Sequence, residues 1–195
     1  VLYPAEFHGQ SAVEAAVMLS KEFLLKRDTI KDVIIETHEP AIRIISNKDV
    51  LNNASDRDHS LEYMVSAALL FGNVTSDSYE DSFHGYEDIE ELRKKITVQE
   101  NPEFTKTYYE FEKREIANTV FLNYEDGTSS EKITVRYPIG HPTRRQEAIP
   151  LIKEKFTRNI SRYFDNEEAS NLWTLVFNLD LDTDFNELTN LLINE

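Results

Sequence analysis

Apolar residues recur every three or four positions along much of the chain, a spacing typical of helices that bury one face. The first such stretch predicts a helix over residues 12–25, with Ser11 and Glu14 spaced as a capping box at its start. A second helix is expected after a similar cap pattern at 55–58. It should end at Gly72, because glycine suits the C-terminus of a helix. Further helical spacing covers residues 76–95, 149–164 and 167–193.

Short runs rich in β-branched residues predict strands between these helices. Residues 31–36 form one such run. Two more, 116–124 and 132–137, flank Glu125-Asp126-Gly127-Thr128, and Asp-Gly between strands is a typical hairpin turn. The stretch 101–112 is expected to be a loop. The class is therefore α+β, with more helices than strands.

The last part of the chain has two features that qualify this picture. Pro150 is compatible with a helix over 149–164 only near its first turn. The helical tail carries apolar residues that are expected to pack on something outside the chain: Trp173, Leu175, Phe177, Leu188, Leu191 and Leu192. Because the chain also starts without a methionine, we expect a piece of a longer polypeptide or a processed chain.

Composition narrows the function classes. A chain of 195 residues with 40% hydrophobic content suits one soluble domain, or one domain and a piece of another. No apolar run approaches the roughly 20 residues that a membrane span needs. The net charge of -15 disfavours nucleic acids and anionic membranes as partners. The absence of cysteine excludes disulfides, thiol catalysis and cysteine-ligated metals within this chain.

Histidines and arginines gather in three short segments. None of the five histidines shows a metal-ligand spacing such as H-x-x-x-H, and motifs such as G-x-S-x-G and G-x-G-x-x-G are missing. The three segments are YPAEFHGQ with His8, DRDH with Arg57 and His59, and GHPTRR with His141, Arg144 and Arg145. Helix starts and neighbouring arginines bind anions, so these six residues are candidates for anion binding.

Each candidate also has a structural alternative. In the second segment, Asp56 can cap a helix while Arg57 pairs with Asp58. In the other two segments, the histidines can be loop or turn residues and the two arginines can be solvated surface charges. The remaining histidines, His38 and His84, are expected to have no role. The spacing of these residues alone leaves the choice open.

Five segments taken together resemble the C-terminal part of the MmgE/PrpD family. They are YPAEFHGQSAVEAA, THEPAIRII, LNNASDRDHSLEYMVSAALLFG, FEKREIANTVFLNYEDGT and YPIGHPTRRQEAIPLIKEKF. The resemblance runs in register over nearly the whole chain, strong over residues 1–160 and weak in the tail. The sequences DRDH and YPIGH are most similar to the dehydratase branch of the family.

The resemblance implies a two-domain, homodimeric hydro-lyase with a large all-helical domain and a smaller, lid-like α+β domain. The implied reaction removes water from 2-methylcitrate to give 2-methylaconitate, in propionate breakdown through the methylcitrate cycle, with no metal or other cofactor. Residues 1–165 would form the small domain. Residues 166–195 would be a helical tail that docks on the large domain. The implied compartment is the bacterial cytoplasm or the mitochondrial matrix.

The resemblance also limits what this chain can do alone. Family members carry a lysine that would fall immediately before Val1, and the large domain is expected to supply the main acid and base. We therefore expect the isolated chain to be inactive and its catalytic residues to lie elsewhere. The expected contribution of this chain is to bind the tricarboxylate through His8, Arg57, His59, His141, Arg144 and Arg145.

Two alternatives stay open at this point. The same family includes cis-aconitate decarboxylase and other enzymes that act on small polyacids, so this fold could serve a different reaction. The chain could instead be a non-catalytic assembly module that reuses the domain. In that case the natural polypeptide would begin near residue 1.

Overall fold

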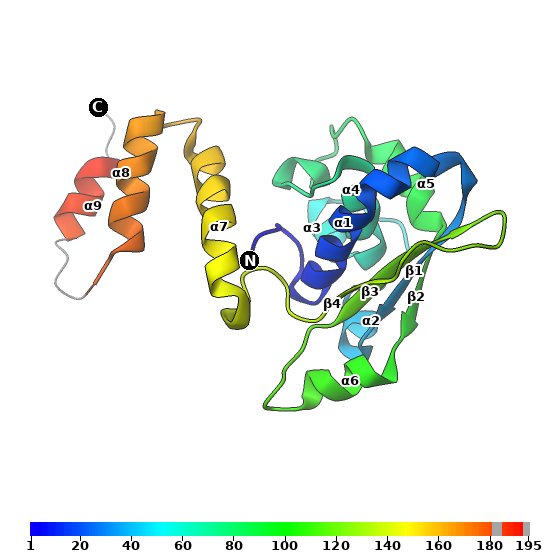
Figure 1. The fold of residues 1–195 in the computed structure, drawn as a ribbon. Coiled ribbons are helices and arrows are strands. Elements are labelled where there is room, and N and C mark those ends of the chain that lie inside the picture. The colour runs from blue at the N-terminus through cyan, green and yellow to red at the C-terminus, as the bar shows by residue number, and fades with distance from the viewer. Residues whose placement is uncertain (181–184, 193–195) are drawn as a thin grey trace. The chain divides into compact units, whose positions relative to one another are not determined.

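The computed structural model describes residues 1–180 and 185–192. The chain divides into two compact units, one formed by Val1 and Tyr3–Arg144 and the other by Leu2 and the residues from Arg145 onward (Figure 1). The first unit contains a mixed sheet with helices packed on it, and the second consists of helices. The expected α+β class is confirmed.

Four strands of the first unit form a mixed sheet in the order β2-β1-β3-β4. Their bounds are β1 (Ile30–Thr37), β2 (Ile96–Glu100), β3 (Asn118–Tyr124) and β4 (Ile133–Val135). Strand β1 is parallel to β2 and antiparallel to β3. Strands β3 and β4 form the predicted hairpin, and Gly127 in its turn has a φ of 84°, which favours glycine. The predicted strand at 31–36 is likewise confirmed.

The sheet buries one face and carries polar pairs on the other. The buried face is lined by Val33, Ile35, Val120 and Leu122, none of which is exposed. On the opposite face, Asn123 donates to Asp32 at 2.7 Å and Lys132 contacts Glu36 at 2.6 Å. This alternation is typical of a sheet that is covered on one side only.

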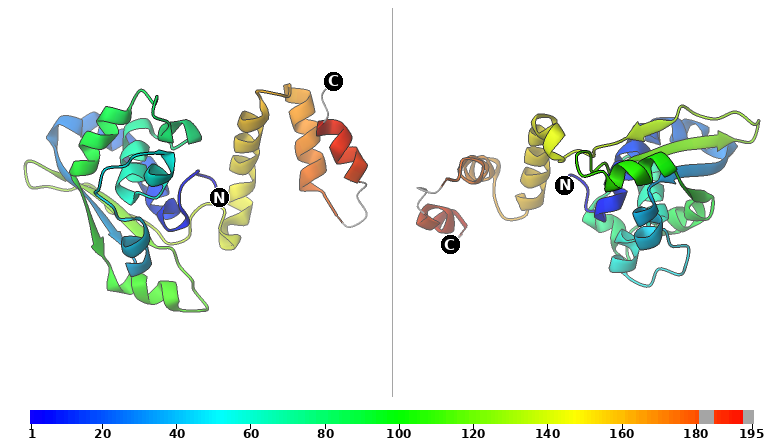
Figure 2. Two further views of the ribbon diagram at one scale, coloured as in Figure 1. Left: turned by 180° about the vertical axis from the view of Figure 1, so that it is seen from behind. Right: turned by 90° about the horizontal axis from the view of Figure 1, so that it is seen from below.

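Helix α1 (Gln10–Lys26) is the central helix of the first unit. It packs against α4 (Leu61–Phe71) and against β3 and β4, and Figure 2 shows these helices on one side of the sheet. Phe23 of α1 and Met64 of α4 lie in the resulting core. Helix α4 ends at Gly72 with a φ of 67°, as the sequence predicts.

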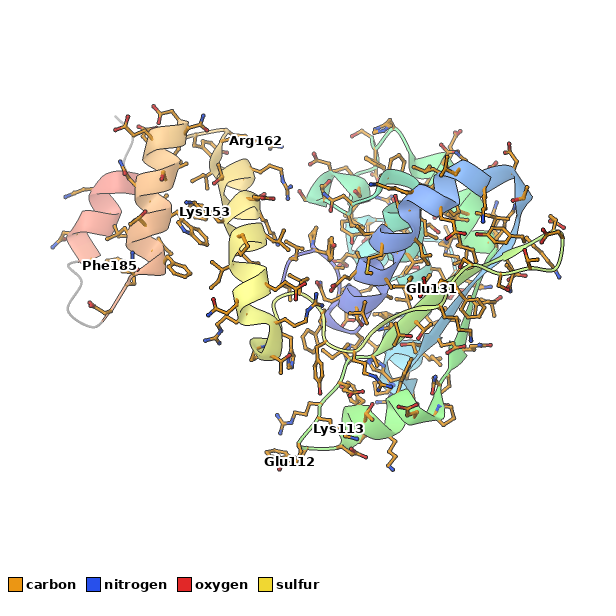
Figure 3. All side chains as sticks on the ribbon, in the orientation of Figure 1. Glu112, Lys113, Glu131, Lys153, Arg162 and Phe185 are labelled. Atoms are coloured by element: carbon orange, nitrogen blue, oxygen red, sulfur yellow. The ribbon has the colours of Figure 1, made fainter. Side chains whose placement is uncertain are left out.

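The other helical segments of the first unit are short. They are η1 (Phe7–Gly9), η2 (Arg27–Thr29), α2 (Glu39–Ile45), α3 (Ala54–Asp58), η3 (Ser76–Tyr79), α5 (Tyr86–Lys94), α6 (Pro102–Tyr109) and η4 (Pro142–Arg144). Figure 3 shows the side chains of the described residues, with Glu112 and Lys113 on the exposed segment after α6.

Several local expectations are corrected by tertiary contacts. Ser11 does not cap α1, because its hydroxyl donates to the carbonyl of Ile116. Glu14 does not close a capping box either, since its carboxylate accepts from the backbone N–H of Ile139 at 2.9 Å. The pattern at 55–58 is not a cap: Asn53 caps α3 and Ser60 caps α4.

Two segment predictions are also wrong. The expected loop at 101–112 contains α6, which starts where Asn101 accepts from the N–H of Glu103 and Pro102 occupies the first position. The expected helix over 76–95 is split into η3 and α5. Gly85 stands at the start of α5, where a Cβ atom would meet the ring of Phe71.

The second unit consists of α7 (Arg145–Ile160), α8 (Asn166–Phe177) and α9 (Phe185–Leu192). The ring of Trp173 lies 5.5 Å from that of Phe156 and 5.3 Å from that of Phe177. Pro150 lies in the second turn, because α7 begins at Arg145 and not at 149. Phe177, Phe185 and Leu192 are exposed, while the side chain of Leu191 lies outside the described residues.

Replacing Ser60 with alanine should lower the free energy of unfolding by about 1 kcal/mol, the usual cost of losing an N-cap. The Ser60 hydroxyl accepts from the N–H of Tyr63 at 3.3 Å and donates to the carbonyl of Asn47 at 3.2 Å. Exposed Ser55 on neighbouring α3 provides the control S55A, expected to stay within about 0.5 kcal/mol. Urea unfolding measures both. An equal loss in S55A would contradict the role of Ser60.

Candidate functional site

The first predicted site residue, His8, lies in a loop that is held at several points. The side chain of Gln10 donates to the carbonyls of Tyr3 at 2.9 Å and Ala5 at 2.6 Å. The amide of Asn118 on β3 donates to the carbonyl of His8 at 3.0 Å. These hydrogen bonds fix the segment 3–9 against α1 and the sheet.

The imidazole of His8 is oriented by a neighbouring carboxylate. One Glu6 oxygen lies 2.8 Å from Nδ1 of His8, and the other accepts from the backbone N–H of His8 at 2.7 Å. Burial alone would raise the pKa of Glu6, but the hydrogen bonds from His8 outweigh it and lower the pKa. An ionised Glu6 keeps the proton on Nδ1 of His8. Nε2 is then directed to the hydroxyl of Tyr108, 3.1 Å away.

A second histidine, His38, lies against both of these groups. Its ring centroid is 5.4 Å from that of His8 and 4.7 Å from that of Tyr108. Nδ1 accepts from the N–H of Ala41 at 3.1 Å and caps α2, and His38 is fully buried. Burial lowers its pKa to about 4, so it is neutral at pH 7. Its Nε2 has no hydrogen-bond partner among the described residues.

A third histidine, His59, reaches the same region from the end of α3. Its Nδ1 lies 2.5 Å from the carboxylate of Asp58, and this hydrogen bond raises the pKa of His59. The N–H of Glu6 donates to the carbonyl of Asp58 at 3.2 Å, which joins the two loops. Glu6 also contributes to raising the pKa of His59.

We call this group the imidazole cluster. Its members are Glu6, His8, His38, Asp58, His59 and Tyr108. Of the predicted site residues it brings together His8 and His59. Sequence reasoning missed Glu6 and Tyr108 and assigned no role to His38. The local signal for His38 was its position before Glu39-Pro40, where a side chain that caps a helix is expected.

Arg57 lies two residues before His59 in sequence, but its guanidinium contacts other residues. It is buried and donates to the carbonyl of Tyr79 and to the carboxylate of Asp81 at 2.5 Å. Its Cζ also lies 5.0 Å from the centroid of the Tyr86 ring. These contacts give Arg57 a structural part in joining α3 to the segment after α4, and a role in substrate binding stays a prediction.

The remaining predicted residues lie within the turn at 137–145. They are His141, Arg144 and Arg145. Arg144 donates to the carboxylate of Glu14 and to the carbonyl of Tyr137, both at 2.7 Å. His141 accepts from the N–H of Thr143 at 3.2 Å, and burial lowers its pKa. Arg145 is exposed at the start of α7. Arg144 therefore fastens the turn to α1, near the loop that carries His8.

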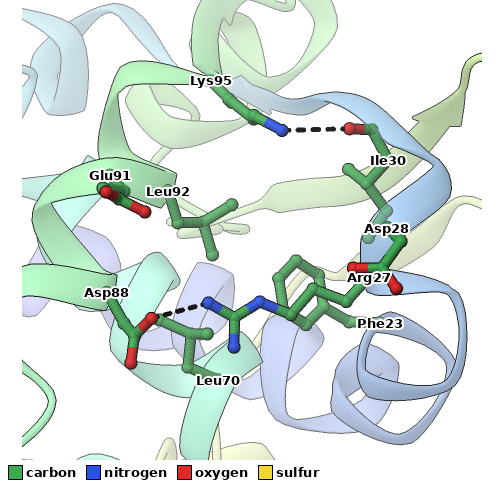
Figure 4. A pocket seen from close by; sticks show the side chains of 9 residues that line it. All are labelled: Phe23, Arg27, Asp28, Ile30, Leu70, Asp88, Glu91, Leu92 and Lys95. Atoms are coloured by element: carbon green, nitrogen blue, oxygen red, sulfur yellow. Dashed lines mark hydrogen bonds and ion pairs between the residues drawn. The ribbon is translucent and has the colours of Figure 1, made fainter.

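The cavity shown in Figure 4 lies away from all of these residues. It has a volume of about 290 Å³ and is lined by Phe23, Arg27, Asp28, Ile30, Leu70, Asp88, Glu91, Leu92 and Lys95. Its two cations are engaged: Arg27 contacts Asp88 at 2.7 Å, and Lys95 donates to the carbonyl of Ile30 at 3.3 Å. Its lining contains none of the six predicted site residues.

Two kinds of site are not found in the part of the chain that the structure describes. No group of three or more histidine, aspartate or glutamate side chains there is placed to hold a metal ion. Within the same residues, every helix is too short or too polar to cross a membrane.

Comparison with known proteins points to one family. The model of the MmgE/PrpD C-terminal domain matches residues 3–181. The 2-methylcitrate dehydratase of Escherichia coli (strain K12) is 45% identical over 175 residues, 88% of this chain and 36% of that protein. The Salmonella typhimurium protein of that name is 40% identical over 198 residues, 100% of this chain and 40% of the relative.

A fungal relative extends this comparison. The 2-methylcitrate dehydratase, mitochondrial, of Yarrowia lipolytica is 37% identical over 191 residues, 93% of this chain and 36% of the relative. The chain thus spans between a third and two fifths of the length of these curated relatives, from 36% to 40%.

The buried neutral state of His38 predicts a dependence of stability on pH. Because its pKa is about 4 in the folded chain and about 6.5 when unfolded, its contribution is fully present above pH 6.5. It should be lost as the pH falls from 6.5 toward 4, on the order of 1–3 kcal/mol. H38N keeps an N-cap acceptor for Ala41 and removes the titrating ring.

Urea unfolding of the wild type and H38N at pH 7 and pH 4.5 measures this contribution. The wild type should lose more unfolding free energy between the two pH values than H38N does. H84N, which replaces a histidine outside the imidazole cluster, should keep the wild-type difference. Identical losses in the wild type and H38N would show that His38 is not the group responsible.

Proposed function

The chain belongs to the MmgE/PrpD family, and we propose that it is the C-terminal part of a 2-methylcitrate dehydratase. Such a hydro-lyase eliminates water from 2-methylcitrate to give 2-methylaconitate, a step of propionate catabolism in the methylcitrate cycle. The support is the name shared by relatives that are 40–45% identical over most of this chain. The reaction needs a base for a proton next to a carboxylate, an acid for the leaving hydroxyl, and cations for the carboxylates.

The observation that carries the proposal is the bond between Glu6 and His8 within the imidazole cluster. A carboxylate that fixes one imidazole nitrogen leaves the other, here directed at the hydroxyl of Tyr108, to exchange a proton, which is the arrangement that acid–base catalysis by histidine requires. His59, with its pKa raised by Asp58, adds a group that favours the cationic form. Together they offer a proton-transfer nitrogen and a positive charge in an otherwise acidic chain.

The turn at 137–145 is the second part of the proposed site. Arg145 is exposed and Arg144 is partly exposed while it holds the turn on α1. We propose that the predicted set of His8, Arg57, His59, His141, Arg144 and Arg145 binds the tricarboxylate or shapes its pocket. A local concentration of positive charge is needed, because a chain with a net charge of -15 repels a trianion.

The remaining proposals concern the whole polypeptide. The relatives are longer than this chain, which supports a further domain in the same polypeptide. We propose, as the resemblance implies, that this domain is helical and carries the main acid and base. We propose that residues 1–165 form the small domain, and that the tail 166–195 uses its exposed apolar side chains to dock on the helical domain. A homodimer, and a bacterial cytoplasm or a mitochondrial matrix as compartment, complete the proposal. The chain alone should then be inactive.

Dehydration of 2-methylcitrate by the full-length enzyme tests the anion site. H59A and R144A should each lower kcat/KM by about 10- to 100-fold, since each removes a charge-assisted contact worth about 1.5–3 kcal/mol. R27A, in the separate cavity of Figure 4, is the matched control and should keep the wild-type value. Normal kcat/KM in both folded variants would refute the assignment.

A further inference from the structure

A chain of hydrogen bonds runs from the carboxylate of Glu6 through the imidazole of His8 to the hydroxyl of Tyr108. Tyr108 lies in the last turn of α6, the helix that the sequence did not reveal, and its side chain is partly exposed. Its oxygen is 3.1 Å from Nε2 of His8, whose Nδ1 is 2.8 Å from Glu6. Residues 100 positions apart are thus joined in one chain.

This chain has two proton arrangements that differ at its outer end. When His8 is neutral, Glu6 keeps the proton on Nδ1, and the phenol donates to Nε2. When His8 is an imidazolium, Nε2–H donates to the phenol oxygen instead. The phenol proton of Tyr108 is then directed away from His8, where a ligand can receive it.

His38 packs against the ring of Tyr108 but is not a member of the hydrogen-bonded chain. Its Nδ1 is engaged by Ala41, and its ring packs at a steep angle, 62°, on the ring of Tyr108. The ionisable groups that surround the two rings come from different elements. They are Glu6 and His8 from the segment before α1, and Glu39 of α2.

We propose, on the basis of the proposed function, that Tyr108 takes over the role of the acid that the resemblance assigns to the further domain, and delivers the proton to the leaving hydroxyl. His38 is its positioning residue. As the C–O bond breaks, its electron pair stays on the oxygen, which takes the phenol proton and leaves as water. The Nε2 proton of His8 replaces the phenol proton, and His8 becomes neutral. A base elsewhere in the protein takes the proton from carbon and releases it to solvent, and His8 recovers its proton from solvent.

The test compares two neighbouring tyrosines in the full-length enzyme. Y108F should lower kcat for dehydration of 2-methylcitrate by about 100- to 10,000-fold, the usual contribution of a general acid, with KM changed less than threefold. Y109F is the matched control, because the Tyr109 hydroxyl is in the same helix but bonds to Glu39 at 3.1 Å. It should keep the wild-type kcat. A wild-type kcat in folded Y108F would overturn the proposal.

Two further measurements separate this proposal from others. H38N should lower kcat at least tenfold with KM changed less than threefold, whereas a rise in KM that accounts for the whole loss of kcat/KM would contradict a positioning role. Histidine labelled with ¹⁵N should show a changed Nε2 signal of His8 in Y108F and an unchanged one in Y109F, because only the Tyr108 hydroxyl lies within hydrogen-bond distance of that nitrogen. If the wild type does not dehydrate 2-methylcitrate, the proposed function fails. The labelled His8 signal then decides alone, and an unchanged Nε2 signal in Y108F overturns the hydrogen-bonded chain from Glu6 to Tyr108.

Discussion

A buried polar junction between α1 and β3 positions the parts of the first unit. Asn118 is fully buried and donates to the hydroxyl of Ser11 at 2.8 Å and to the carbonyl of His8 at 3.0 Å. The Ser11 hydroxyl in turn donates a hydrogen bond to the carbonyl of Ile116. A buried polar group that loses its partner costs about 1–3 kcal/mol. The junction therefore favours a single alignment of α1 on β3. It thereby fixes the loop that carries His8.

Glu14, in the same part of α1, binds one of the cations that the sequence places in the turn at 137–145. The Glu14 carboxylate accepts Arg144 on one oxygen and the N–H of Ile139 on the other, at 2.7 and 2.9 Å. The two prolines stiffen the turn and Gly140 supplies its positive φ of 99°, but the buried carboxylate of Glu14 determines where the turn lies. Arg144 therefore has a partner in the folded chain, and a ligand would have to share that cation rather than find it free.

Local sequence chemistry predicted those elements that local chemistry stabilises. The hairpin at Asp126-Gly127 and the end of α4 at Gly72 depend on backbone angles that few residues other than glycine adopt. The supposed capping box failed because Ser11 and Glu14 bond to residues 105 and 125 positions away. In the candidate site, turn and helix signals point to His8 and His59, whose roles stay predictions. Tyr108 was missed because only tertiary folding brings it to His8.

The imidazole cluster contains two histidines with opposite protonation preferences. Burial keeps His38 neutral, with a pKa of about 4, while Asp58 raises the pKa of His59 and favours its charged form. Between them, Glu6 fixes the ring of His8 without neutralising His59, because both Glu6 oxygens are occupied by His8. Environments that drive neighbouring pKa values apart are how one site supplies both an acid and a positive charge near pH 7. The fold thus assigns different tasks to three identical side chains.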